Sequence, residues 1–178
     1  MKKNELDEIQ EEYSKRTSEI TEKGWQGYRG MVFQEILCAH LEKYMPSGLE
    51  FVKRAWVEDH PQEIDLLLVK KGAEPIDLTP AYRSDDVIRV FEIKASGMFC
   101  KKENVEEVLR EFNSRITEGT GKEFTYITRR ESRRNSISTK NALGNDAYIF
   151  FIGNGENRIT NYDDWTRLII SIKKTKAL

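Results

Sequence analysis

Two acidic residues and one lysine lie inside apolar segments of the chain, where charged side chains are uncommon. Asp65 falls in residues 63–70, and Glu92 and Lys94 fall in residues 87–94. Both segments are short and rich in β-branched residues, so we predict strands. Side chains alternate faces along a strand, which places Glu92 and Lys94 on one side. If the two strands pair in an antiparallel hairpin, Asp65 lies beside Glu92. Two such carboxylates repel each other, and a divalent cation would relieve that repulsion.

An aspartate followed by Glu-x-Lys resembles the PD-(D/E)xK nuclease superfamily, which includes many type II restriction endonucleases and DNA-repair nucleases. The literal Pro-Asp pair is absent, because Ile64 precedes Asp65. Asp77, in Pro75-Ile76-Asp77, is an alternative first acid. It lies in a loop-like stretch rather than at the edge of an apolar strand, so we prefer Asp65. The resemblance implies a Mg²⁺-dependent DNA endonuclease that is similar to restriction endonucleases.

The resemblance also implies a role for each matching residue. Asp65, Glu92 and the Ile93 carbonyl would bind Mg²⁺, with Mn²⁺ as a substitute, and Lys94 would orient the attacking water. In several branches of the superfamily an acid on the first helix joins the metal site, and Glu35 matches that element. A solvated surface glutamate is the other interpretation of Glu35. Glu92 and Lys94 could likewise be an exposed ion pair, which contributes only ~0–1 kcal/mol.

The elements that must position these residues follow the order helix, three strands, helix, strand over residues 25–128. This αβββαβ order is that of the superfamily core. Helical spacing of apolar residues predicts helices at 25–44 and 103–117, and strand patterns occur at 49–57, 63–70, 87–94, 124–128 and 147–152. Residues 71–86 read as an enlarged loop, and residues 165–172 as a last strand or a short helix. We therefore predict an α/β (α+β) fold with a central mixed sheet flanked by helices.

An additional charged helix is predicted at the N-terminus, and we divide the chain into this segment, residues 1–22, and a nuclease-like domain, residues 23–178. Leu6, Ile9, Tyr13 and Ile20 recur at helical spacing, which gives the helix one narrow apolar side. This stripe packs either on the domain or on a partner. One nuclease site cuts one strand of DNA, and two sites related by a two-fold axis cut both strands of a duplex. We therefore predict a homodimer and treat the stripe as a candidate interface.

Basic residues are dense directly after the predicted strand at 124–128. Because guanidinium groups bind phosphate through a bidentate fork, we predict a loop here that binds DNA. A solvated basic loop is the alternative. The formal net charge of −1 does not exclude a local basic surface of this kind. The predicted nucleic-acid-binding residues are Arg129, Arg130, Arg133, Arg134 and Lys140.

Composition limits the classes of protein that remain possible. The chain has 178 residues, of which 38% are hydrophobic and 33% charged, as in a soluble domain with a modest core. No apolar run approaches the ~20 residues that span a bilayer, so we expect a cytoplasmic protein with no membrane partner. Cys38 and Cys100 lack metal-ligand spacing, and we interpret them as buried free thiols. Two other functions remain open, a catalytically inactive nucleic-acid-binding module of the same fold and a protein-interaction domain that uses the N-terminal helix.

Overall fold

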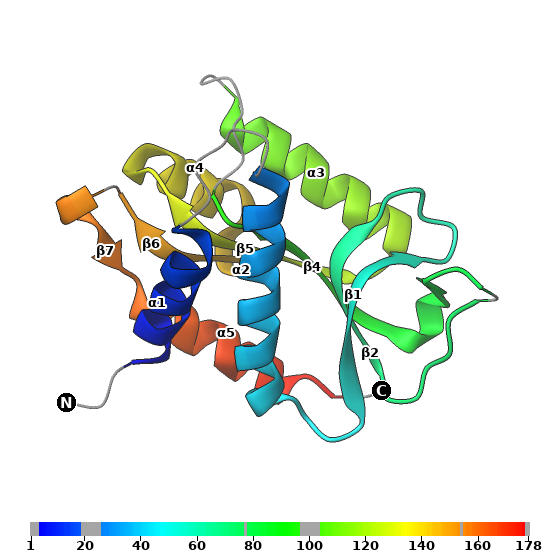
Figure 1. Ribbon diagram of the computed structural model, residues 1–178. Helices are drawn as coiled ribbons and strands as arrows, with labels where there is room; N and C mark the ends of the chain where they lie inside the picture. The colour runs from blue at the N-terminus through cyan, green and yellow to red at the C-terminus, as the bar shows by residue number, and fades with distance from the viewer. Residues whose placement is uncertain (1–3, 19–25, 77, 97–103, 154, 177–178) are drawn as a thin grey trace.

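A mixed β-sheet lies between two layers of helices in the computed structural model (Figure 1). The structure describes residues 4–18, 26–76, 78–96, 104–153 and 155–176. One face of the sheet is covered by α1 (Glu5–Thr17), α2 (Gln26–Leu41) and α5 (Tyr162–Lys174). The other face is covered by α3 (Val105–Thr120) and α4 (Arg133–Leu143). The predicted α/β architecture, with an additional N-terminal helix, is confirmed.

The described residues form seven strands in the order β3-β1-β2-β4-β5-β6-β7. Neighbouring strands run antiparallel from β1 through β2 to β4, and parallel from β4 through β5 to β6. The five strands predicted from the sequence are present as β1, β2, β4, β5 and β6. The bounds are β1 (Leu49–Val57), β2 (Ile64–Lys70), β3 (Ala81–Tyr82), β4 (Val87–Lys94), β5 (Glu123–Glu131), β6 (Ala147–Ile152) and β7 (Ile159–Thr160). Short 3₁₀ turns occupy Glu42–Tyr44, Ser84–Asp86, Gly144–Asp146 and Gly155–Asn157.

The register of β2 against β4 sets the position of the acidic residues. Leu66 lies opposite Phe91 and Leu67 lies opposite Val90 in this antiparallel pair. Continuing that register by one residue places Asp65 opposite Glu92. The hairpin that the sequence analysis assumed is therefore the one that forms.

The apolar stripe of α1 packs on its own chain. Leu6, Ile9 and Tyr13 are buried in the hydrophobic core that α2 and α5 share. Tyr13 contacts the ring of Phe33 edge to face, with ring centroids 6.1 Å apart. The proposal that this stripe forms a dimer interface is wrong for these three residues, because their side chains are already covered. Ile20 lies outside the described residues.

The structure decides between the two alternatives for residues 165–172 and corrects the prediction for residues 71–86. Residues 165–172 belong to helix α5, which begins after Asn161, whose side chain accepts the Asp164 amide at 3.3 Å. Trp165, Leu168 and Ile172 then recur at helical spacing and are buried. The stretch 71–86 is not wholly a loop, because its residues Ala81–Tyr82 form β3, which pairs parallel with β1.

Two simpler expectations concern the membrane and the thiols. Within the described part of the chain, no helix combines the length and the apolar character needed to cross a bilayer. Cys38 is a buried free thiol, and burial raises its pKa to about 12. Cys100 lies outside the described residues.

Candidate active site

Asp65, Glu92 and Lys94 meet where strands β2 and β4 lie side by side. The Lys94 Nζ lies 3.4 Å from the Asp65 Oδ2 and forms an ion pair with the Glu92 carboxylate. The Ile93 backbone N–H donates to the same Asp65 oxygen at 2.8 Å. The structure therefore brings together all three charged residues that the sequence analysis singled out on these strands.

The carboxyl group of Glu92 is the most strongly perturbed member of this site. Burial, followed by the negative charge of Asp65, raises the pKa of Glu92 to about 7, although Lys94 opposes the shift. Only 11% of the Glu92 side chain is exposed, against 27% for Asp65. A buried carboxylate facing a second carboxylate is poorly compensated by one lysine. This arrangement favours the binding of an additional cation.

Lys94 is held as a cation by the same two acids. Burial alone would lower its pKa, but the charges and hydrogen bonds of Glu92 and Asp65 raise it above the ordinary value. An ammonium group with a raised pKa donates hydrogen bonds and stabilises negative charge, and it is a poor proton acceptor at neutral pH.

Gln34, rather than Glu35, extends from α2 toward this site. The Gln34 side-chain amide is buried and donates to the backbone carbonyl of Asp65. Glu35 is 55% exposed and forms an ion pair with Lys53 at 2.6 Å. Glu35 is also absent from the described residues that line the surface cavity of about 560 Å³ beside Asp65 and Lys94, whereas Gln34 is among them. The structure therefore does not bring Glu35 together with the other candidate residues.

The donor groups at this site fit a magnesium ion. Within the described residues, no group of three or more His, Cys, Asp and Glu side chains is placed to hold a metal. Asp65 and Glu92 supply two carboxylates, and Ile93 supplies a backbone carbonyl between Glu92 and Lys94. Mg²⁺ is usually held by one or two carboxylates, with water and substrate phosphate as its other ligands, so this smaller set is sufficient.

Comparison with solved structures identifies the fold. The structure of E. coli MS115-1 NucC in its cAAA-bound form matches 96% of this chain and 88% of its own, with a TM-score of 0.63 and 15% identity. The chain has the NucC fold. P. aeruginosa ATCC27853 NucC, also in a cAAA-bound form, matches with a TM-score of 0.60 and 13% identity over 96% of this chain and 88% of that one. For the apo form of E. coli NucC the TM-score is 0.56 at 13% identity, over 96% of this chain and 91% of that one. No protein-family model matches the sequence, and no curated protein matches it.

The basic segment that follows the predicted fourth strand is not a loop in this NucC-like fold. Strand β5 continues as far as Glu131, and α4 begins at Arg133 with Ser132 as its N-cap. Arg129 and Arg130 therefore belong to a strand, and this part of the prediction is wrong. The hydroxyl of Ser132 accepts the Asn135 amide at 3.1 Å, which explains why the helix begins here.

Arg129 is buried rather than free to bind phosphate. Its guanidinium lies over the Tyr13 ring, with the central carbon 4.0 Å from the ring centroid. It also donates to the Ala95 carbonyl at 3.1 Å and to the Gln10 side chain at 3.0 Å. Burial lowers the pKa of Arg129 to about 10. The prediction that Arg129 binds DNA is corrected to a role in joining α1 to the ends of β4 and β5.

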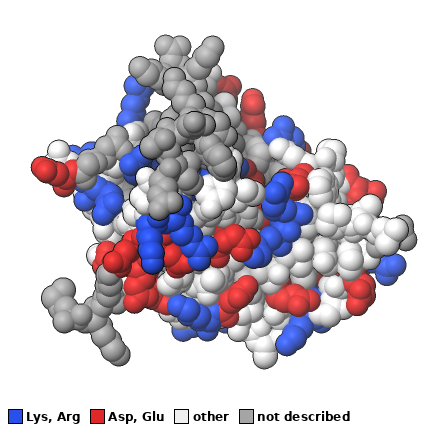
Figure 2. All heavy atoms as spheres, in the orientation of Figure 1, with Lys and Arg blue, Asp and Glu red and all other residues white. Residues whose placement is uncertain are grey.

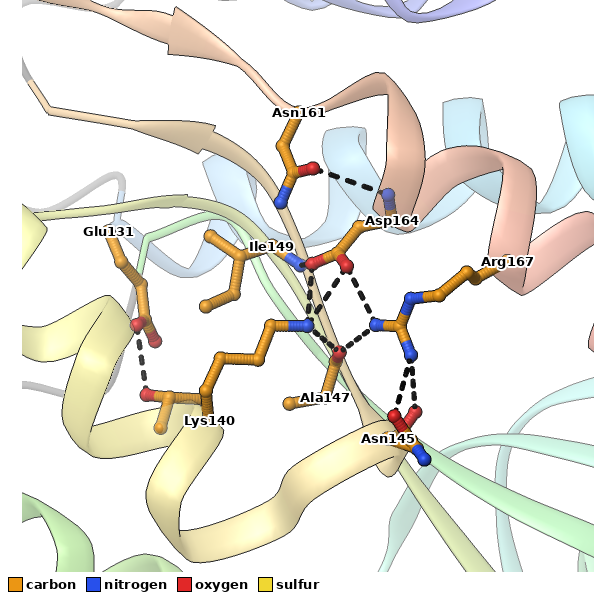
Figure 3. Close-up of polar contacts among 9 residues, drawn as sticks. Glu131, Lys140, Asn145, Ala147, Ile149, Asn161, Asp164 and Arg167 are labelled. Atoms are coloured by element: carbon orange, nitrogen blue, oxygen red, sulfur yellow. Dashed lines mark hydrogen bonds and ion pairs between the residues drawn. The ribbon is translucent and has the colours of Figure 1, made fainter.

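Lys140 takes part in a structural ion-pair network (Figure 3). Its ammonium lies 2.8 Å from Asp164 Oδ2 and donates to the Ala147 carbonyl at 2.6 Å. Asp164 is buried, and it also accepts from Arg167 at 2.7 Å and from the Ile149 amide at 2.8 Å. This network connects α4, β6 and α5, so Lys140 is already engaged within the protein and the prediction that it binds DNA is corrected.

The remaining basic residues of the segment are accessible. Arg133 and Arg134 are exposed and Arg130 is half-buried. Strand β5 runs parallel to β4, with Thr128 opposite Lys94. The arginines follow Thr128 along the chain, so they lie at the same end of these strands as the candidate site. On the face that carries α1 and α2, acidic and basic side chains are intermixed (Figure 2).

Glu131, at the end of β5, is a second buried acid. It accepts a hydrogen bond from the Thr139 hydroxyl at 2.9 Å and a longer one from the Tyr126 hydroxyl at 3.5 Å. Burial raises its pKa to about 7. No nearby feature of the sequence marks it as buried, because it stands between arginine and serine.

The raised pKa of Glu131 predicts a dependence of stability on pH. The folded protein holds this proton up to about pH 7, whereas the unfolded chain releases it near the ordinary glutamate pKa of 4.5. The contribution of Glu131 to the free energy of unfolding therefore falls as pH rises between these values, by up to about 3 kcal/mol. We expect Glu131→Gln to be more stable than the wild type at pH 8 and similar to it at pH 4. Urea unfolding of both proteins at the two pH values tests this. The same difference in free energy of unfolding between variant and wild type at pH 4 and pH 8 would contradict it.

Proposed function

We propose that this protein is a Mg²⁺-dependent DNA endonuclease. The observation that carries the proposal is the convergence of Asp65, Glu92 and Lys94 on neighbouring strands beside a surface cavity. Both carboxylates contact the same ammonium group, so one small site combines metal-binding oxygens with a cation. The likeness of the whole fold to NucC also supports a DNA endonuclease.

Each residue has a role that follows from its chemistry. Asp65, Glu92 and the Ile93 carbonyl would hold Mg²⁺, or Mn²⁺ in its place. When bound, the metal supplies a more acidic water and neutralises charge on the phosphate. Lys94 donates hydrogen bonds to the attacking water and to the phosphate oxygens, where negative charge increases in the transition state. The Ile93 amide keeps the Asp65 carboxylate in place.

The DNA-binding surface that we propose begins at the accessible arginines Arg130, Arg133 and Arg134. They lie where β4 and β5 end, and Lys94 is at this same end of the strands. Duplex DNA that contacts them through its phosphates would pass close to the candidate site. Arg129 and Lys140 are left out of this surface, because both are held by contacts within the protein.

Incubation of the purified protein with supercoiled plasmid tests the proposal. We expect nicked or linear DNA with Mg²⁺ or Mn²⁺ and intact plasmid with EDTA. Because two of the NucC structures are in a cAAA-bound form, the assay includes cAAA as a separate condition. Intact plasmid under every condition would contradict the proposal, and binding without cleavage would identify a catalytically inactive nucleic-acid-binding module.

We also propose that the active form is a homodimer, since two sites related by a two-fold axis cut both strands of a duplex. The interface lies outside the apolar stripe of α1, which is buried in the protein core. Light scattering should give twice the chain mass of 20.8 kDa. The monomer mass, measured with and without DNA, would contradict the dimer.

A further inference from the structure

Strand β1 contains an arginine in a backbone conformation that arginine rarely adopts. Arg54 has φ 53°, in the left-handed region. Lys53 pairs with Leu66 and Ala55 with Ile64 on the neighbouring strand β2, so Arg54 stands opposite Asp65. Residues held in this region by the surrounding structure concentrate at functional sites.

The left-handed residue changes the direction of its own side chain. In a regular strand, neighbouring residues point to opposite faces. Here Lys53 contacts Glu35 and Arg54 contacts Met31, so two consecutive side chains both reach α2. The strand then continues with Ala55 buried on the α3 side. Local irregularities of this kind often re-aim a side chain next to an active site.

The guanidinium of Arg54 is held at the cavity of the candidate site. Its Nε donates to Glu63 Oε1 at 3.2 Å, and its Nη1 lies 3.7 Å from the Met31 sulfur. The side chain is 57% exposed. Arg54 and Lys94 are the basic residues in the described part of the cavity lining, which also includes Asp65. Two of the guanidinium nitrogens are thus held by contacts within the protein, at the lining of the cavity.

We propose that Arg54 binds a phosphate of the DNA substrate in this cavity. The proposal rests on the proposed endonuclease function and adds a residue that positions the substrate for it. Guanidinium groups bind phosphate oxygens through two parallel hydrogen bonds, which fix orientation as well as position. A phosphate held by Arg54 lies beside Asp65, on the strand next to β2. Lys94 and Glu92 lie on β4, the other neighbour of β2, so the substrate would be held from both sides of Asp65.

Binding and cleavage of duplex DNA by Arg54 variants test this proposal. In EDTA, we expect Arg54→Ala to weaken binding roughly tenfold or more. The slope of log affinity against log salt should fall in magnitude by about 0.9, as for one lost phosphate contact. With Mg²⁺, cleavage should fall as well. Arg54→Lys should keep the salt slope, because it keeps the charge. It should cleave slowly, because lysine cannot donate two parallel hydrogen bonds to a phosphate.

Arg54→Gly separates substrate binding from a structural role. Glycine adopts φ 53° without strain, so the melting temperature should be unchanged or higher while cleavage falls as in Arg54→Ala. Arg110→Ala is the matched control, because Arg110 is 59% exposed and also paired with a glutamate, but it lies on α3. This control should bind and cleave like the wild type.

The outcomes distinguish this proposal from the proposed function. If the wild type cleaves DNA and Arg54→Ala keeps both its rate and its salt slope, the assignment of Arg54 is wrong and the endonuclease stands. A lower melting temperature in Arg54→Gly, with cleavage normal for the folded fraction, would show a structural role instead. If the wild type neither binds nor cleaves DNA, both proposals are wrong.

Discussion

Plasmid cleavage by Lys94→Ala is expected to fall by about 10²–10³-fold, which is the usual cost of removing one group that stabilises transition-state charge. The protein should remain folded, because the Lys94 side chain is 32% exposed and lies at the end of β4. Its removal leaves Asp65 and Glu92 to face each other without their shared cation. Rates measured at saturating Mg²⁺ and DNA, together with circular dichroism, test this expectation.

Lys70→Ala is the matched control for this variant. Lys70 is 38% exposed and lies 3.9 Å from an Asp86 carboxylate oxygen, but it stands at the other end of β2 from Asp65. It should cleave at the wild-type rate. In Asp65→Asn, calorimetric titration should also show much weaker binding of Mg²⁺ or Mn²⁺. Wild-type cleavage by a folded Lys94→Ala protein would place the chemistry elsewhere.

Asp164→Ala is expected to lower the free energy of unfolding by about 3 kcal/mol, the lower end of the range for breaking a buried ion pair. Asp164 is 4% exposed and contacts Lys140, Arg167 and the Ile149 amide. Removing it leaves two cations and one buried amide without their acceptor. The two cations are each about one-third exposed, so they recover part of their hydration, and this limits the loss.

Urea unfolding at pH 7 measures this loss. Asp163→Ala is the matched control, because it removes an exposed carboxylate from the same turn of α5. It should cost less than about 1 kcal/mol, which is the size of a helix-dipole contribution. Equal losses in the two variants would show that the network contributes little beyond the charge at the start of the helix.

The sequence was sufficient to predict the central hairpin and the meeting of Asp65 with Glu92. Both strands are short apolar runs, and a charge inside such a run stands out against its neighbours. Antiparallel pairing then fixes which residues lie opposite one another once the strands are in register. The same reasoning does not reveal Arg54, because a left-handed backbone conformation at a non-glycine residue leaves no pattern in the sequence.

The pattern of α2 explains why the sequence left two interpretations of Glu35 open. Val32, Phe33, Ile36 and Leu37 are all buried, so apolar residues surround much of this helix. A helix of this kind does not show by periodicity alone which polar residue faces the protein. Only the packed structure shows that the residue before Glu35 turns inward.

The arginine-rich segment was misread for a different reason. Charge density suggests exposure, but a long arginine side chain can bury its stem and stack on an aromatic ring. The partner of Arg129 is Tyr13, which is 116 residues away in the sequence, and such contacts are not visible in local composition. Arg133 and Arg134 have no such partner ring among the described residues, and they remain at the surface.

The left-handed backbone conformation of Arg54 in β1 also affects how the protein avoids aggregation. β1 is a nine-residue strand, and on its outer side the described residues pair with it at Trp56 and Val57 alone. A long edge strand of this kind would accept a strand from another molecule. Charged side chains and a local break in the extended backbone both oppose such edge-to-edge pairing, and Lys53 and Arg54 supply them together. The conformation that directs Arg54 to the cavity therefore also interrupts the part of the edge that another chain would use.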